Sequence, residues 1–284
     1  MVEHALNSQR RAGRIRVPHV SAYRARTLLI QLVILAAWLL IWQYLPDWHW
    51  VRERYKFLDP FFISSPTRVA RTLAYLVTGA HGYPKVWPYA RLTIEASVLG
   101  TMIGTFVGAS LGLLLSNSKA LSDVIKPFIV AANAVPRIAV IPIIVIVWGP
   151  TLTSSMVTSI TVVIFVVFFN AYAGGLSVSP HVLQNARLLG ANPVQIMLGV
   201  RLRYVTAWTV AVLPNAVSFS LISVVTAEIL TGSVGMGRLL LNSVTTIDAS
   251  MTIASAVVLS IAGIILVGLT EILRRRALHW WARD

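Results

Sequence analysis

Long apolar stretches separated by polar connections dominate the pattern of this 284-residue chain. Six stretches are long enough to cross a bilayer as helices, because about 20 apolar residues span its hydrocarbon core. They lie at about 27–45, 92–115, 124–148, 153–172, 205–230 and 251–273. The pattern predicts an all-α polytopic membrane protein with six transmembrane helices, in which a basic tail at 1–26 precedes a single membrane domain at 27–284.

One polar interruption, at about 174–203, contains an amphipathic helical hairpin at 180–197. Apolar and polar residues lie on opposite faces of its first helix: Val182, Leu183, Ala186 and Leu189 against Gln184, Asn185 and Arg187. Gly190 is placed to end this helix in the left-handed conformation. Asn192 and Pro193 supply an N-cap and a first-turn proline for the next helix. The hairpin is either a docking surface for another protein or an interfacial helix resting on lipid.

Glycines and prolines mark two of the predicted spans. Glycine recurs every four residues at 100, 104, 108 and 112, and such a ridge lets two helix backbones approach closely in lipid. The third span contains Pro127, Pro136 and Pro142. Each proline removes a backbone hydrogen bond and can kink the helix. We expect a packing ridge in the second span and a bent third span.

Arg137 and Glu228 are the candidate residues of a translocation pathway. Arg137 follows the central proline near mid-membrane depth, where an arginine is costly unless it faces a polar cavity or a partner. It either pairs with an oxyanionic solute, binds the backbone carbonyls that Pro136 frees, or reaches the headgroups. Glu228, near the end of the fifth span, either pairs with Arg238, caps the glycine-rich connection that follows, or takes part in gating.

Composition and charge agree with a membrane protein. Hydrophobic residues make up 56% of the chain and charged residues only 12%, against about 25% charged in soluble domains. The net charge of +14 comes from basic residues that flank the spans, which predicts contact with the lipid bilayer and not with nucleic acid. Arginine-rich tails favour cytoplasmic termini, and the same topology places the hairpin in the cytoplasm.

The sequence contains none of the common catalytic or phosphate-binding motifs. It has no G-x-x-x-x-G-K-[ST], H-E-x-x-H or G-x-S-x-G, and no cysteine. The spans carry no carboxylate or histidine relay of the kind that a proton-driven pump needs. We therefore predict a non-catalytic chain that binds no cofactor or metal and draws its energy from another subunit. A stand-alone secondary transporter or channel is the alternative, and a membrane-embedded enzyme is disfavoured.

The hairpin and several short motifs together resemble the permease subunits of binding-protein-dependent ABC importers, within them the nitrate, sulfonate and taurine class. The resemblance covers about residues 60–284. Its motifs are Ser64-Ser65-Pro66, Pro136-x-x-Ala139-x-x-Pro142 leading to Trp148-Gly149, Asn170-x-Tyr172-x-Gly174, and Ala227-Glu228 followed by Gly235-Met236-Gly237. In the coupling loop of that family, the acidic position is Gln184 here, the alanines are Asn185 and Ala186, and the glycine is Gly190. Leu202-Arg203 stands where Leu-Pro is usual.

The resemblance implies a type I importer permease in a bacterial inner membrane. Two copies, or a pair with a non-identical permease, would form the pore beside two ATP-binding cassette ATPase subunits, which hold ATP and Mg²⁺, and an extracytoplasmic binding protein. The coupling residues would be Val182, Gln184, Asn185, Ala186, Arg187, Gly190 and Ala191. Without an acidic anchor, docking is expected to rest on shape and apolar contact. The implied solute is small and anionic, and sulfonates, taurine, nitrate, aromatic carboxylates and pyrimidine precursors all remain open.

Overall fold

The computed structural model describes residues 20–48, 54–55 and 60–278, apart from the side chains of 20–25, 47 and 60. The described residues form helices and irregular connections, with no strand among them. The chain divides after Thr67 into two units, which are described separately. The first 19 residues of the predicted basic tail lie outside the described part of the chain.

The first unit contains α2 (Val20–Tyr44), the 3-10 turn η1 (Leu45–Asp47) and α4 (Pro60–Ile63). The helix α2 corresponds to the first predicted span but begins at Val20 rather than at 27. Its apolar stretch Arg26–Tyr44 is long enough to cross a membrane. At its end, the indole of Trp42 donates to the carbonyl of Ile63 at 3.4 Å, and the amide of Thr67 donates to Gln43 Oε1 at 3.2 Å.

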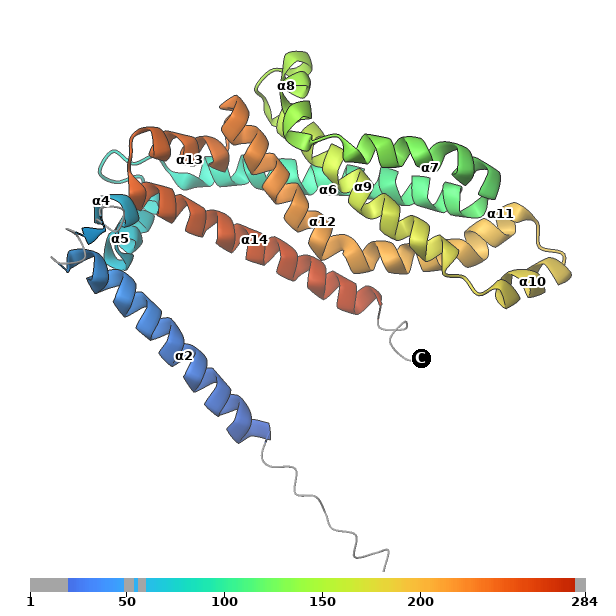
Figure 1. The fold of residues 1–284 in the computed structure, drawn as a ribbon, viewed down its shortest axis with the longest axis horizontal. Helices are drawn as coiled ribbons and strands as arrows, with labels where there is room; N and C mark the ends of the chain where they lie inside the picture. Colours follow the sequence, from blue (N-terminus) through green and yellow to red (C-terminus); the bar gives the residue numbers. More distant parts are fainter. Residues whose placement is uncertain (1–19, 49–53, 56–59, 279–284) are drawn as a thin grey trace, which may run out of the picture. The chain divides into compact units, whose positions relative to one another are not determined.

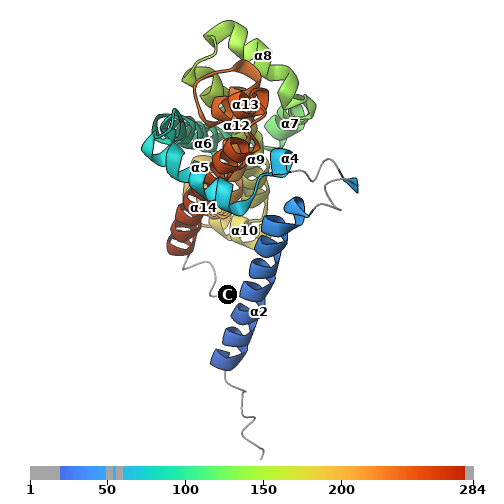
Figure 2. The same ribbon diagram turned by 90° about the vertical axis from the view of Figure 1, so that its left-hand side faces the viewer.

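The helix α5 (Pro66–Thr78) starts at a proline, whose fixed φ and missing amide hydrogen suit the first turn of a helix. In the second unit, α6 (Val86–Asn117), α9 (Leu152–Leu176) and α12 (Leu202–Thr231) form a packed core. The helix α9 packs along α6, and α12 packs against both, as Figures 1 and 2 show. Val163 and Val167 of α9 meet Ala216 and Val212 of α12 in its buried centre.

The glycines of α6 form the predicted packing ridge against α9. A Cβ on Gly104 would lie 2.7 Å from Val163 Cβ, and one on Gly108 would lie 2.6 Å from the carbonyl oxygen of Ile164. A Cβ on Gly112 would lie 2.6 Å from Ala171 Cβ. The two backbones are therefore too close for any side chain between them, which confirms the expected role of the ladder.

The third predicted span is not one continuous helix. It comprises α7 (Lys119–Ala134) and α8 (Arg137–Trp148), which meet at an angle of 90°. Figure 1 shows α8 turning away from the line of α7. Proline lacks an amide hydrogen and disfavours the helical conformation of the residue before it, and Val135 has an extended backbone with ψ of 125°. Pro127 and Pro142 stay inside their helices, so only the central proline breaks the span.

The last helices are α13 (Met236–Thr245) and α14 (Ala249–Ala277). Asp248 caps α14 by accepting the amide hydrogen of Met251 at 2.9 Å, and its other oxygen accepts the Tyr83 hydroxyl at 3.3 Å. Burial raises the pKa of Tyr83, and the charge of Asp248 raises it further. Among the described residues, five helices are long and apolar enough to cross a membrane, or six if the bent pair α7–α8 is one span.

The predicted hairpin lies between α9 and α12. It consists of α10 (Pro180–Leu188), α11 (Pro193–Ile196) and the π-helical turn η3 (Met197–Arg201), which runs directly into α12. The fifth predicted span thus starts three residues earlier than expected and continues the second arm of the hairpin. Helical structure extends from 193 to 231.

Candidate functional site

Gly190 ends the first hairpin helix as the sequence predicts. Its φ of +82° lies in the left-handed region. The amide of Ala191 donates to the carbonyl of Ala186 at 3.0 Å, and the amide of Gly190 donates to that of Arg187 at 2.9 Å. These two bonds form a Schellman motif, which satisfies the last carbonyls of the helix and reverses the chain.

Asn192 begins the second hairpin helix through a reciprocal pair of hydrogen bonds. Its side-chain oxygen accepts the amide hydrogen of Gln195 at 2.8 Å, and Gln195 Oε1 accepts that of Asn192 at 2.8 Å. Pro193 occupies the first helical turn. The predicted N-cap is confirmed, and the turn is defined by backbone conformation and capping on both sides.

The hairpin presents large apolar side chains that nothing in the described chain covers. Leu188 is 85% exposed, Leu189 is 88% exposed and Val182 is 42% exposed. No residue of α10 is buried. The remaining predicted coupling residues lie on the same hairpin: Gln184, Asn185, Arg187 and Gly190 are exposed, and Ala186 and Ala191 are half-buried. Exposed leucines within a polar segment mark a surface that binds protein or lipid.

Arg201 closes the base of the hairpin, a contact that the sequence analysis missed. Its Nη1 donates at 2.6 Å to the carbonyl of Gly175, which lies 26 positions earlier in the chain on the other side of the hairpin. Gly175 lies in the last turn of α9, where unpaired carbonyls and the helix dipole favour a cation. The two chain segments that enter and leave the hairpin are therefore tied together.

Arg137 is the first residue of α8, directly after the break. Its Nη2 donates to Asn133 Oδ1 at 2.8 Å and to the Asn133 carbonyl at 3.4 Å. Its guanidinium carbon lies 4.4 Å from the ring centre of Phe165 on α9. One partner of Arg137 is therefore the backbone carbonyl of Asn133, which lies at the end of α7 where the helix is broken. Nε and Nη1 of Arg137 have no hydrogen-bond partner among the described residues, so these two nitrogens of the guanidinium group remain able to donate hydrogen bonds to a ligand.

Glu228 lies in a buried junction of α6, α12 and α13. Its side chain is only 1% exposed. Both carboxyl oxygens lie within hydrogen-bond distance of the Thr93 hydroxyl, at 2.8 and 3.0 Å, and Oε2 accepts the amide hydrogen of Gly237 at 2.8 Å. The Thr93 hydroxyl also accepts the amide hydrogen of Met236 at 2.8 Å. Of the predicted alternatives, Glu228 therefore caps the glycine-rich connection, whereas Arg238 is exposed on α13.

Thr93 is the residue of this junction that sequence reasoning missed, since a threonine in an apolar helix carries no distinctive signal. The glycines of this junction, in contrast, were recognisable in the sequence as part of the motif Gly235-Met236-Gly237. The structure explains Gly237, because an added Cβ there would lie 2.6 Å from the carbonyl oxygen of Val225. The junction holds α13 against the ends of two spans. No described contact joins it to Arg137, so the two pathway candidates belong to separate sites.

We expect Thr93→Val to destabilise this junction. The valine keeps the shape but leaves the Met236 amide and a Glu228 oxygen without their partner, at about 1–3 kcal/mol for each buried unsatisfied group. Thermal unfolding of the purified chain in detergent measures the effect, with Thr93→Ser as the control that keeps the hydroxyl. Equal melting temperatures for the valine and serine variants would contradict the described hydrogen bonds.

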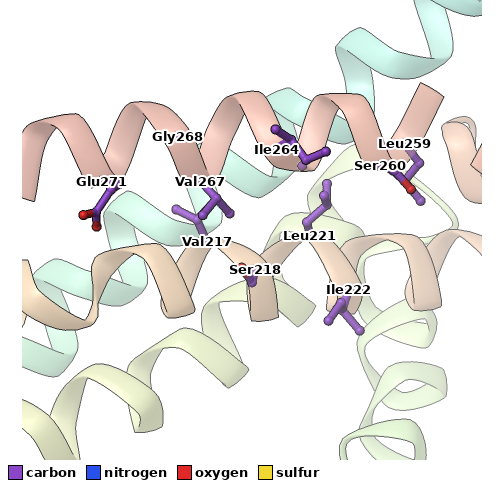
Figure 3. Close-up of a pocket in the computed structure, with 11 residues that line it drawn as sticks. Val217, Ser218, Leu221, Ile222, Leu259, Ser260, Ile264, Val267, Gly268 and Glu271 are labelled. Carbon is purple, nitrogen blue, oxygen red and sulfur yellow. The ribbon is translucent and has the colours of Figure 1, made fainter. Parts of the chain in front are cut away.

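A groove of about 600 Å³ lies between α12 and α14, as Figure 3 shows. Its walls are mostly aliphatic, with Leu221, Ile264 and Val267 among them. The acidic group at its end, Glu271, accepts hydrogen bonds from Arg274 at 2.7 Å and from Arg275 at 2.8 Å. Because that carboxylate is already paired, the groove offers an apolar surface rather than a site for a charged solute.

Fold and hairpin together define a polytopic helical membrane protein with an exposed, capped hairpin between two spans. The chain belongs to the family of binding-protein-dependent transport system inner membrane components, whose pattern matches residues 100–279. This confirms the resemblance that the motifs predict. The family consists of transporter subunits that are not catalytic in general.

Several individual proteins are similar to this chain. The chain is 28% identical over 174 residues to a probable ABC transporter permease protein of Haemophilus influenzae, covering 61% of this chain and 71% of the relative. It is 22% identical to the taurine transport system permease protein TauC of Escherichia coli, over 90% and 91% of the two chains. It is 21% identical to the putative aliphatic sulfonates transport permease protein SsuC of Bacillus subtilis, over 77% and 78%.

A solved structure supports the fold. A chain of the methionine ABC transporter MetNI, in a structure of its inward-facing conformations, matches with a TM-score of 0.60 at 17% identity. The match covers 70% of this chain and 96% of that chain. The predicted all-α, type I importer permease fold is confirmed by this likeness and by the family membership.

Proposed function

We propose that this chain is the pore-forming subunit of an ATP-driven importer for a small anionic solute, and that the loop at about 174–203, which contains the hairpin at 180–197, couples it to ATPase subunits. The observation that carries the proposal is the exposed hairpin. Leu188 and Leu189 project from a segment whose turn and base are both held by specific hydrogen bonds. Such a surface can be gripped by a partner and moved without unfolding.

The proposal includes the assembly around the chain. Two copies would form the pore, each hairpin would contact one ATP-binding cassette subunit, and ATP and Mg²⁺ would be held by those subunits alone. An extracytoplasmic binding protein would deliver the solute. The arginines near both ends of the sequence support a bacterial inner-membrane topology with cytoplasmic termini and a cytoplasmic hairpin. The relatives named for taurine and aliphatic sulfonates support the importer assignment.

The docking contact is expected to be apolar. The family's acidic position is Gln184 here, and the largest exposed side chains near it are those of Leu188 and Leu189. Burying a leucine side chain contributes about 1.5–3 kcal/mol, whereas an exposed ion pair contributes about 1 kcal/mol or less. The hairpin can therefore bind a partner without an acidic anchor.

Arg137 supports an anionic solute. Its guanidinium is oriented by Asn133 and by the ring of Phe165, and it retains donors that the described chain does not use. Guanidinium groups bind the oxygens of sulfonates and carboxylates through paired hydrogen bonds. Glu228 is expected to act differently, because its oxygens already bind Thr93 and Gly237. We assign it to holding α13 in place rather than to binding solute.

Co-purification tests the assignment against a stand-alone transporter or channel. The chain, purified from its native membrane in mild detergent, is expected to carry a bound ATPase. In proteoliposomes, the extracytoplasmic binding protein loaded with solute should then stimulate ATP hydrolysis and drive uptake. If no ATPase accompanies the chain, and uptake proceeds without ATP, the importer assignment is wrong and the stand-alone alternative holds.

Gly190→Val is expected to uncouple ATP hydrolysis from transport. The added side chain has space, since nothing lies within 4 Å of an added Cβ, so the effect comes from the backbone. Valine resists the φ of +82°, and a left-handed residue other than glycine costs about 1–2 kcal/mol. Asparagine tolerates this conformation, so Gly190→Asn is the matched control.

The measurement is the number of ATP molecules hydrolysed per solute imported. The valine variant should hydrolyse ATP with little uptake, and the asparagine variant should resemble the unchanged protein. Normal uptake by the valine variant would show that the shape of the turn does not matter for coupling.

A further inference from the structure

The groove between α12 and α14 separates two helices that are long and apolar enough to cross a membrane. Its residues on α14 run from Leu259 to Glu271, which is about 18 Å at 1.5 Å per residue. The hydrocarbon core of a bilayer is about 30 Å thick, so the groove is a little longer than one leaflet is thick. Its length therefore suits one acyl chain of a lipid that lies along the helices.

The wall of the groove suits a hydrocarbon chain. Ile222 and Ile264 are 61% and 71% exposed, and Figure 3 shows both side chains at the groove. The two hydroxyl groups of the wall are already used, because Ser218 and Ser260 each donate to a backbone carbonyl of their own helix, at 3.0 and 2.8 Å. From its far end to Glu271, the groove therefore presents apolar surface and no hydroxyl that lacks a partner.

Two glycines of α14 keep the groove open. Gly263 lies opposite Leu221, where an added Cβ would be 3.2 Å from Leu221 Cδ2. Gly268 lines the groove closer to Glu271, and nothing lies within 4 Å of an added Cβ there. A larger side chain at 268 would therefore take up space in the groove without a clash with the described chain.

A cluster of arginines follows the groove at the end of α14. Arg274 and Arg275 both donate to Glu271, and Arg276 comes next in the chain. Within 271–276, three arginines and one carboxylate leave two net positive charges. The side chain of Arg275 is 76% exposed, and its Nη1 and Nη2 have no hydrogen-bond partner among the described residues. Basic residues at the end of a span lie at the membrane surface, so the cluster is placed to bind an anionic headgroup.

We propose that this groove is a binding site for an anionic phospholipid, with one acyl chain between α12 and α14 and the phosphate on Arg275. Basic pockets between membrane-spanning helices bind anionic headgroups in this way. A zwitterionic lipid carries a cation beside its phosphate, so the net positive charge of the cluster favours an anionic lipid. The site concerns the bilayer and not the transported solute, so it does not depend on the proposed import function.

Quenching by brominated acyl chains tests the site. The sequence has no cysteine, so Ile222→Cys carries a single fluorophore on this chain at the groove. The chain, with any subunits that accompany it from its native membrane, is reconstituted in phosphatidylcholine vesicles. Half-maximal quenching should need about tenfold less brominated phosphatidylglycerol than brominated phosphatidylcholine, a preference of about 1.4 kcal/mol.

Two controls accompany this measurement. Ile265→Cys places the fluorophore on an exposed position of α14 outside the groove, where the two brominated lipids should quench alike. The cysteine-free chain, treated with the same reagent, supplies the background from any other labelled subunit.

Two substitutions separate the headgroup from the acyl chain. Arg275→Gln should lower the preference about fivefold, the equivalent of about 1 kcal/mol for one arginine at an anionic surface. Arg91→Gln is the matched control, because Arg91 on α6 is also exposed and paired with a glutamate four residues away, Glu95. Gly268→Phe should remove the preference by filling the groove, whereas Ala256→Phe, exposed on α14 outside the groove, should not.

Three results would overturn the site. Equal quenching at 222 by the two lipids would show ordinary contact with the bilayer. No quenching at 222 by either lipid, while the fluorophore at 265 is quenched, would show that a second copy or another protein segment covers the groove. A preference that survives Gly268→Phe would place the anionic lipid on the arginines alone, without a chain in the groove.

Discussion

Gly108→Leu is expected to prevent the chain from accumulating in folded form. An added Cβ would lie 2.6 Å from the carbonyl oxygen of Ile164 and 3.1 Å from the amide nitrogen of Phe168. Both are backbone atoms of α9, so no change of rotamer relieves the clash, and α6 must move away from α9. Overpacking typically costs about 1–3 kcal/mol where side chains can shift, and we expect the upper end of that range or more here.

Size-exclusion profiles and thermal unfolding of the purified chain in detergent measure the effect. Gly268→Leu is the matched control, because it adds the same side chain to the membrane-spanning helix α14, at a position where nothing lies within 4 Å of an added Cβ. If the Gly108 variant purified in normal yield with an unchanged melting temperature, the close contact between α6 and α9 would be wrong as described.

Arg137→Ala is expected to abolish uptake and leave assembly intact. Among the described residues, its hydrogen bonds go to Asn133 and its ring contact is with Phe165, so its removal is expected to disturb little of the packed core. Removing one partner of a desolvated charged contact costs about 2–5 kcal/mol. Since each 1.4 kcal/mol is a factor of ten, we expect uptake to fall by about 100-fold or more.

Arg137→Lys separates charge from geometry. Lysine keeps the positive charge but lacks the planar fork, so this variant should retain partial uptake. In both variants the ATPase should still bind and respond to the loaded binding protein. Loss of assembly in the alanine variant would make Arg137 a structural residue of the helix break instead of a pathway residue.

The spans could be predicted from sequence because a long apolar segment in lipid can satisfy all of its backbone hydrogen bonds within itself by forming a helix. The glycine ladder of α6 and the caps around Gly190 were predictable for a related reason. The ladder depends on the missing side chain of glycine, and the turn depends on the left-handed backbone that glycine adopts at 190, so both are visible as residue types in the sequence.

The break at Pro136 could not be located in the same way. Pro127, Pro136 and Pro142 look alike in the sequence, and only the structure shows that the chain turns at the second while the others stay helical. The contacts of Thr93 with Glu228 and of Arg201 with Gly175 also escaped prediction. They join residues 135 and 26 positions apart, and each depends on how helices pack rather than on a local pattern.

The helical structure from 193 to 231 has a consequence for how motion travels through this chain. One end is the second arm of the hairpin and the other holds Glu228, so a tilt imposed at the first end reaches the junction with α6 and α13. Pro214 lies inside this helical segment near its middle, where one backbone hydrogen bond is missing, so the helix bends more easily there than in an unbroken stretch. If a partner moves the hairpin, as proposed, part of that movement is therefore expected to be taken up as bending of α12 at Pro214.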